Sequence, residues 1–122
     1  MEVRIKRVYE AVQEEDGIRV LIDRLWPRGI SKEAAQVDFW IRNVAPSSEL
    51  RKWFGHVPER FDEFRVKYIK ELETDPEKIA ALMDLSRALK GNKGTLIYAA
   101  KDTVYNHAVV LKDFLKKYKE EA

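Results

Sequence analysis

Two short polar segments carry the side chains of this chain that could bind an anion or move a proton. The first, residues 23–29 (DRLWPRG), places Arg24 and Arg28 four positions apart around a rigid Trp-Pro pair. An arginine guanidinium presents a planar fork of donors that fits a carboxylate or a phosphate. We therefore predict that Arg24 and Arg28 clamp an anionic group with Trp26 beside them, although a single surface arginine is more often simply solvated.

The second segment, residues 101–107 (KDTVYNH), leads from a predicted strand into a predicted helix. On a helix that starts near Thr103, His107 shares a face with the apolar residues three and four positions later, so its imidazole should point toward the sheet. It could there serve as a general acid or base, or as a donor to an anion. A core histidine bonded to a backbone carbonyl is an equally good interpretation.

The carboxylates near these segments each have a structural alternative. Asp102 could orient His107, or it could only cap the last helix. Asp23 could orient His107 or a clamping arginine, or it could pair with Arg24. We name His107 and Asp102 as the catalytic candidates in case the protein turns a substrate over.

Loop and aromatic positions supply further ligand-binding candidates. His56 follows a predicted helix and is interpreted first as a loop or capping residue and second as a ligand contact. Trp26, Trp40 and Trp53 could stack on nucleic-acid bases, although aromatic residues at this density more often form core. The predicted ligand-binding set is Arg24, Arg28, Lys101, Asn106, Trp26 and His56.

Several chemistries are excluded or disfavoured by residues that the sequence lacks. It contains no cysteine, which excludes disulfides, thiolate metal sites, iron–sulfur clusters and cysteine nucleophiles. Two histidines without paired carboxylates at ligand spacing predict no metal site. The sequence also has no Gly-rich phosphate loop and no Gly-x-Ser-x-Gly elbow. We therefore expect neither a metal nor a cofactor.

Composition and charge describe an ordinary globular domain. The 122 residues are 45% hydrophobic and 36% charged, with a net charge of +2. Residues 1–61 carry 11 Lys and Arg against 10 Asp and Glu, and residues 62–122 carry 12 against 11, so neither half is strongly basic. This even distribution argues against bulk polyanion binding and leaves nucleic acid as the alternative partner.

No apolar run in the sequence is as long as a signal-peptide core or a membrane span. We expect a cytoplasmic protein that does not contact a membrane. The sequence gives no indication of its oligomeric state.

Apolar runs predict the strands that must position these side chains. Segments 18–23 and 95–100 contain the continuous apolar runs typical of strands buried on both faces, and residues 3–9 predict a further strand. Residues 37–41 fit either a short strand or a helical turn. Strands separated by helices predict one α/β domain over residues 1–122, with a small parallel or mixed sheet of about four strands covered by helices.

Capping residues and periodicity predict the first two principal helices. A short helix over residues 48–54 ends at Gly55, where a left-handed residue is favoured. Pro58 opens the next helix, which carries an apolar stripe between Phe61 and Leu72.

The last two helices are predicted in the same way. One starts at Asp75-Pro76, and its last helical residues precede the break at residues 91–94. Its expected inner face consists of Ile79, Leu82, Met83 and Leu89. Asp102 or Thr103 should cap the final helix. Ligands of open α/β sheets bind outside the carboxyl ends of the strands, where both polar segments lie.

Three motifs of this chain resemble the YeaO-like branch of the family called domain of unknown function 488. They are residues 23–29, residues 45–56 (APSSELRKWFGH, with position 48 outside the motif) and residues 98–108 (YAAKD followed by NHA). The resemblance covers nearly the whole chain and implies a small cytoplasmic α/β protein of a kind common in bacteria and archaea. It also implies that the predicted residues of the two polar segments form one site, namely Arg24, Arg28, Lys101, Asp102, Asn106 and His107.

Longer relatives in that family carry cysteine where this chain has Tyr98-Ala99-Ala100 and Asn106. Thiol chemistry therefore does not carry over to this chain. We predict instead a cleft that binds a small phosphate- or carboxylate-bearing molecule, with thiol-independent proton transfer or hydrolysis as the permitted reactions. The alternatives are a nucleic-acid-binding or regulatory module and an interaction surface without a ligand.

Overall fold

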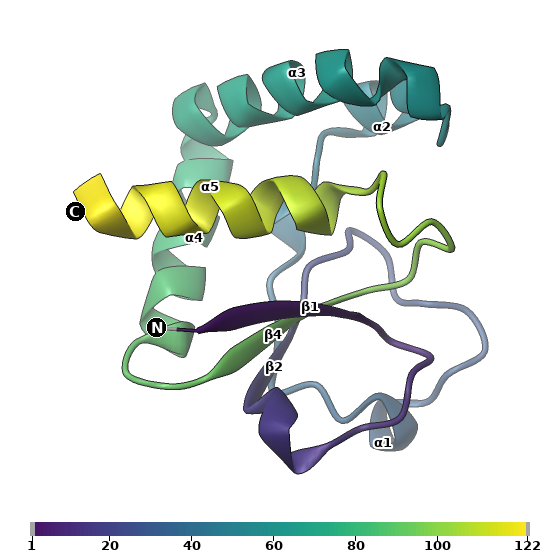
Figure 1. The fold of residues 1–122 in the computed structure, drawn as a ribbon, viewed down its shortest axis with the longest axis vertical. Coiled ribbons are helices and arrows are strands. Elements are labelled where there is room, and N and C mark those ends of the chain that lie inside the picture. Colours follow the sequence, from purple (N-terminus) through teal and green to yellow (C-terminus); the bar gives the residue numbers. More distant parts are fainter. Residues whose placement is uncertain (1, 122) are drawn as a thin grey trace.

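The computed structural model describes the backbone of residues 2–121 and the side chains of residues 2–118. Within this part of the chain, four parallel strands form one sheet in the order β1-β4-β2-β3, of which Figure 1 labels β1, β4 and β2. The strands are β1 (Val3–Arg7), β2 (Ile18–Leu21), β3 (Phe39–Trp40) and β4 (Gly94–Tyr98). The predicted α/β fold class is thus confirmed, and residues 37–41 contain a short strand rather than a helical turn.

Helices and 3-10 turns connect the strands. The helices are α1 (Lys32–Ala35), α2 (Ser48–Phe54), α3 (Phe61–Thr74), α4 (Pro76–Leu89) and α5 (His107–Glu121). The 3-10 turns are η1 (Glu14–Asp16), η2 (Arg42–Val44) and η3 (Pro58–Arg60). None of these helices, within residues 2–121, is long and apolar enough to cross a membrane.

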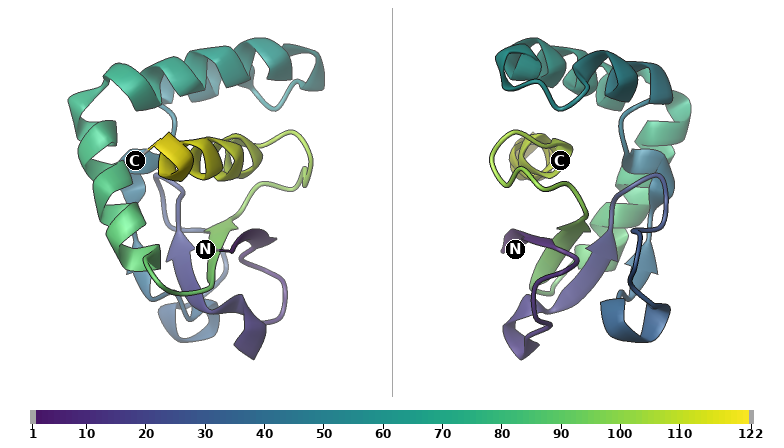
Figure 2. Two further views of the ribbon diagram at one scale, coloured as in Figure 1. Left: turned by 60° about the vertical axis from the view of Figure 1, so that its left-hand side comes forward. Right: turned by 90° about the vertical axis from the view of Figure 1, so that its right-hand side faces the viewer.

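The principal helices cover one face of the sheet in two tiers. α4 and α5 contact the strands, and α3 packs on both of them from the far side, with α2 next to it (Figures 1 and 2). The large core lies between these tiers and the sheet, where Val20, Leu96 and Tyr98 meet the aromatic stripe of α3. In that stripe Phe64 and Tyr68 are buried, as the periodicity predicted.

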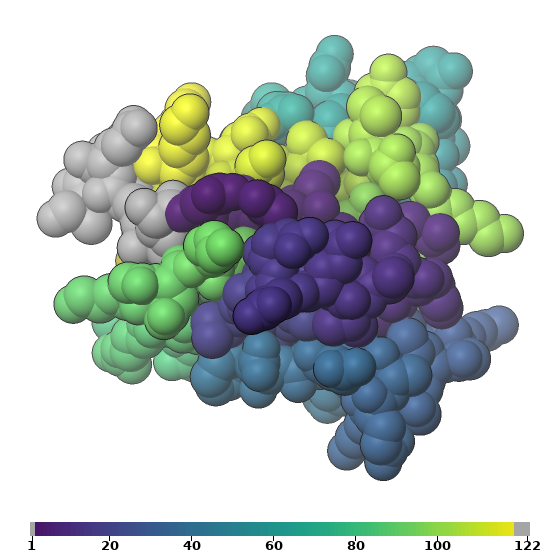
Figure 3. Space-filling view, turned by 60° about the horizontal axis from the view of Figure 1, so that its bottom comes forward, coloured from purple at the N-terminus to yellow at the C-terminus, as the bar shows by residue number. Residues whose placement is uncertain are grey.

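The opposite face of the sheet is covered by the segment 24–37 and not by a long helix. A smaller core of Val8, Leu21, Ala35 and Ile97 lies there, with Trp26 and Trp40 packed against it. The four-residue α1 is the helical part of this cover, and Figure 3 views this side, with α1 in blue below the purple N-terminal strand and turn. Because the cover is mostly loop, its shape depends on side-chain hydrogen bonds.

The predicted inner face of α4 is wrong in part. Ile79 and Met83 are 38% and 45% exposed, whereas Leu82 and Leu89 are buried as expected. The buried stripe follows helical spacing from Lys78, which is itself only 3% exposed. The sequence pattern did not reveal this stripe because a lysine, which is usually exposed, occupies its first position. The aliphatic stem of Lys78 packs there like an apolar side chain.

Candidate functional site

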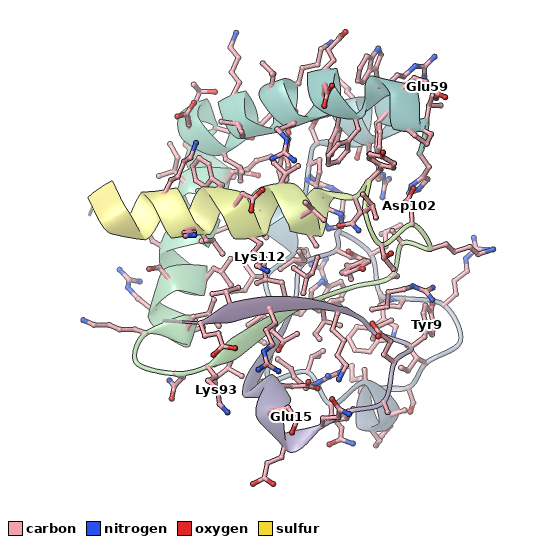
Figure 4. All side chains as sticks on the ribbon, viewed as in Figure 1. Tyr9, Glu15, Glu59, Lys93, Asp102 and Lys112 are labelled. Atoms are coloured by element: carbon pink, nitrogen blue, oxygen red, sulfur yellow. The ribbon has the colours of Figure 1, made fainter. Side chains whose placement is uncertain are left out.

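A cleft of about 870 Å³ opens at the carboxyl ends of β1, β2 and β4. Its walls come from Tyr9 after β1, residues 23–28 after β2, residues 99–107 after β4, and α2 with the residues beside it. The labelled Tyr9 and Asp102 lie together at this end of the molecule (Figure 4). Both polar segments singled out in the sequence therefore line the same cleft.

Five cationic side chains line the cleft, and we call them the cationic rim: Arg24, Arg28, Arg51, Lys52 and Lys101. The carboxylates among the lining residues are Asp23 and Asp102. Within residues 2–118, no member of the cationic rim has a carboxylate oxygen within 4.0 Å. The cleft therefore has an excess of positive charge that the described part of the protein does not neutralise by ion pairs.

The loop that carries Arg24 and Arg28 is fixed by two hydrogen bonds. The Trp26 indole N–H donates to the Ile30 carbonyl oxygen at 2.7 Å, and the Tyr9 hydroxyl donates to the Arg28 carbonyl oxygen at 2.7 Å. The Trp26 ring also packs edge-on against Trp40, with centroids 5.5 Å apart. Trp26 thus lines the cleft and at the same time anchors the loop, so its indole N–H is already used.

His107 faces Asp23 across the floor of the cleft. His107 Nε2 lies 3.0 Å from Asp23 Oδ1, and the two side chains are 16% and 17% exposed. The contact is too poorly aligned to be a hydrogen bond, and neither atom has a hydrogen-bond partner among the described residues. The other carboxylate oxygen of Asp23 accepts from the Ala99 backbone N–H at 3.0 Å. Of the two partners considered for Asp23, the structure therefore brings His107 to it and not Arg24.

The last helix starts later than predicted, and its cap is a different residue. α5 begins at His107, and the Asn106 side-chain oxygen accepts from the Val109 backbone N–H at 3.1 Å. Asn106 also donates to the Asp102 carbonyl oxygen at 2.8 Å and is buried. Asp102 and Thr103 are thus not the helix cap, because residues 102–106 form a separate turn before the helix.

Asp102 holds that turn together. Its Oδ1 accepts from the Val104 and Tyr105 backbone N–H groups, each at 2.9 Å. The Tyr105 N–H and then the Val104 N–H lower the pKa of Asp102 below its ordinary value, and the nearby His56 lowers it further. A carboxylate held in its ionised form suits turn formation better than proton donation.

The remaining predicted residues also line the cleft. His56 follows the left-handed Gly55 and has a positive φ of 58°, which turns its exposed ring toward the opening. Lys101 is exposed at the mouth, and Asn106 is buried beside His107. All eight predicted site residues are therefore at one cleft.

The sequence interpretation missed Arg51 and Lys52 as site residues. They belong to α2, whose cap Ser47 accepts from the Leu50 backbone N–H. Glu71 of α3 holds this cap, because its carboxylate accepts from the Ser47 N–H at 2.9 Å and from the Ser47 hydroxyl at 2.6 Å. The signal available in the sequence was their position directly before Trp53-Phe54, within the second family motif.

The site contains no evident place for a metal. Among the residues that the structure describes, no group of three or more His, Asp or Glu side chains is arranged to hold an ion. What the cleft offers chemically is a set of cations, one imidazole beside a carboxylate, and apolar walls that include Pro27, Phe54 and Phe64. Such a surface suits an anionic molecule with an apolar body.

Comparison with known proteins gives a family and no activity. A family model described as the inactive DUF488-N3 subclade matches residues 2–122. The uncharacterized protein YeaO of Escherichia coli is 41% identical over 116 residues, covering 95% of this chain and 98% of that protein. Uncharacterized proteins of Mycobacterium tuberculosis and Mycobacterium bovis are 44% identical over 113 residues, covering 93% of this chain and 92% of each relative. No solved structure matches this chain significantly.

Proposed function

Because this chain belongs to the inactive DUF488-N3 subclade, we propose that its cleft binds a small phosphate- or carboxylate-bearing molecule without turning it over. The observation that carries the proposal is the cationic rim, whose five side chains surround one cleft without a carboxylate partner within 4.0 Å in residues 2–118. Arginine and lysine in this arrangement favour an anion by charge, and arginine adds directional hydrogen bonds.

Arg24 gives additional support. Its Nε is shielded from solvent and has no hydrogen-bond partner in the described part of the chain. Leaving a buried donor unpaired costs about 1–3 kcal/mol, and a bound ion is one of the reasons for which native proteins keep such a group. An anion that engages the guanidinium would offset part of this cost.

Thermal unfolding in sulfate and in inorganic phosphate, against sodium chloride at matched ionic strength, tests the proposal. Ligand at about a hundred times its Kd adds roughly 2.7 kcal/mol to stability, which corresponds to several degrees in Tm. We expect this shift in the wild type and its loss in Arg24→Gln and Arg28→Ala. Arg28→Ala keeps the carbonyl oxygen that anchors the loop to Tyr9.

The matched control is Arg87→Ala, which removes the same charge from an exposed position of α4 outside the cleft. It should retain the full shift. An equal response of all four proteins, or no response in the wild type, would contradict the proposal.

Nucleic acid stays the alternative partner. It predicts binding of a single-stranded oligonucleotide that weakens by orders of magnitude between low and moderate salt. The Trp53 ring, which base stacking would need, already packs against Lys67 Nζ at 4.4 Å from its centroid. The small-anion proposal therefore has the stronger support.

A further inference from the structure

The Asp23–His107 contact divides the imidazole into two different ends. Nε2 faces the carboxylate and is shielded from solvent. Nδ1 has no hydrogen-bond partner among the described residues and is not shielded, and the His107 side chain lines the cleft. A neutral ring next to a carboxylate keeps its proton on the nitrogen that faces the carboxylate. The free lone pair is then on Nδ1, where a ligand can reach it.

A bound anion changes the net charge of the groups that surround the His107 imidazole. The cationic rim opposes a further positive charge in the cleft, and His56 is the other imidazole that lines it. Asp23, next to Nε2, favours that charge. Asp102 is the other carboxylate of the cleft, and the buried Tyr68 hydroxyl is a further titratable group on which the charge of Asp23 acts. A bound dianion offsets the rim, so that protonation of the imidazole is opposed much less.

We infer that His107 takes up a proton on Nδ1 when a dianion enters the cleft, and that Asp23 is the positioning residue that holds the other ring proton on Nε2. The imidazolium then donates a hydrogen bond to the anion from Nδ1 and forms an ion pair with Asp23 through Nε2. This inference rests on the proposed anion binding and adds that the ligand is recognised in its dianionic form. The proton comes from the solvent, so binding must weaken as the pH rises.

The ligand-free protein tests the arrangement of the ring first. In the wild type, ¹⁵N chemical shifts of the neutral His107 ring should show the proton on Nε2. In Asp23→Asn, the amide oxygen can still accept from the Ala99 N–H, and the amide N–H₂ then faces Nε2. Because an amide N–H can only donate, the neutral ring should move its proton to Nδ1. His56 is the internal control, and its tautomer should not change.

Sulfate tests the proton uptake, because it stays a dianion throughout the relevant pH range. Calorimetric titration with sulfate at about pH 8 is carried out in two buffers of different ionisation enthalpy. We expect about one proton taken up per sulfate and an affinity that falls by up to about tenfold per pH unit. His107→Gln should bind sulfate more weakly and without proton uptake.

His56→Gln is the matched variant, since it removes the chain's other histidine from the same cleft. It should retain the proton uptake even if its affinity changes. Sulfate binding without proton exchange, or proton uptake that persists in His107→Gln, would overturn this inference and leave the proposed function intact. No sulfate binding by the wild type would overturn the proposed function and this inference together. An unchanged tautomer in Asp23→Asn would remove the role assigned to Asp23.

Discussion

Arg19 Nη1 lies 2.6 Å from Asp16 Oδ2, and both side chains are only 4% exposed. The other Asp16 oxygen lies 2.9 Å from Lys6 Nζ, and the Arg19 guanidinium also donates to the Ala35 carbonyl oxygen at 2.8 Å. This cluster joins β1, η1, β2 and α1 beneath the sheet face that lacks a long helix. Its ion pairs and hydrogen bonds help to hold this face of the sheet in place, as helix packing does on the other face.

Asp16→Asn should lower the free energy of unfolding by about 3–5 kcal/mol at pH 7, because it leaves a buried guanidinium and a partly buried ammonium without their carboxylate. Urea unfolding measures this difference. The exposed pair between Arg4 and Glu2, at 2.9 Å, is the control, and Glu2→Gln should cost less than about 1 kcal/mol. Equal effects of the two substitutions would contradict the assignment of Asp16 to a buried cluster.

The same carboxylate should make stability depend on acid. Burial alone raises the pKa of Asp16, but Lys6, the Gln13 backbone N–H and Arg19 together bring it below its ordinary value. The unfolded chain therefore binds this proton more readily than the folded one. The stabilisation is present above the unfolded-state pKa of about 3.9 and is lost as the pH falls through the lower folded value. Asp16→Asn should flatten this acid limb in unfolding curves recorded from pH 6 to pH 2.

Lys78 differs from Asp16 in that the folded protein disfavours the charged form of its side chain. Burial lowers the pKa of Lys78, although Glu71 and Asp75 raise it. Among the described residues its Nζ has only long polar contacts, 3.4 Å to the Asn43 carbonyl oxygen and 4.0 Å to Asp75 Oδ2. Lys78→Met, which keeps the volume, should therefore raise the free energy of unfolding at pH 7 by about 1 kcal/mol.

The pH dependence identifies this lysine. Between its lowered folded pKa and the ordinary value of about 10.4, the unfolded chain binds more protons, so wild-type stability rises with pH in that window. Lys78→Met should lose this rise, and Lys70→Met, at an exposed position of α3, should keep it. A clear destabilisation by Lys78→Met at pH 7 would show that its amine makes better contacts than these.

Asn106 should contribute more to stability than Asp102. Asn106→Ala removes the cap of α5 and should cost about 1–2 kcal/mol. It should also weaken sulfate binding, since His107 is the first residue of that helix. Asp102→Ala affects an exposed turn and should have the smaller effect in thermal unfolding. The reverse order would restore Asp102 as the cap predicted from sequence.

Alanine substitutions at two glycines with positive φ distinguish the cost of backbone strain from the cost of steric crowding. Gly17 has a φ of +65°, and a Cβ there would collide with the Lys93 carbonyl oxygen, whereas Gly91 has a φ of +75° and open space around it. Gly91→Ala should cost about 1–2 kcal/mol, and Gly17→Ala at least about 3 kcal/mol. Glu15 and Lys93 lie away from Tyr9 and Asp102 (Figure 4), so neither substitution should change the sulfate affinity of the folded protein.

Local chemistry made much of the fold predictable. Ser47, Gly55 and Asp75 cap their helices as their residue types indicate, because caps depend on a few neighbouring backbone groups. The start of α5 was harder to predict, because Asp102 and Asn106 are both of residue types that favour helix N-caps. In the structure the first helical residue, His107, contacts Asp23 of the distant segment after β2, and the local sequence does not contain that information.

The cleft itself was predictable only in part, for the same reason. Arg24, Arg28 and His107 could be located because residues after buried strands share one edge of the sheet. Arg51 and Lys52 enter the cleft because Glu71 of α3 holds the first turn of α2 over that edge. The side of a short helix that faces a cleft is set by such distant contacts, so periodicity alone does not reveal it.

β4 lies between β1 and β2, and Val3 is opposite Gly94 in the sheet. The first two strands therefore cannot complete a sheet while the ribosome is still making the residues before 94. Contacts over such long sequence separations form slowly and leave strand edges open in the meantime. Because residues 99–107 emerge later still, the cleft assembles only after they have been made, and under the proposed function an anion would stabilise these longer chains and not shorter nascent ones.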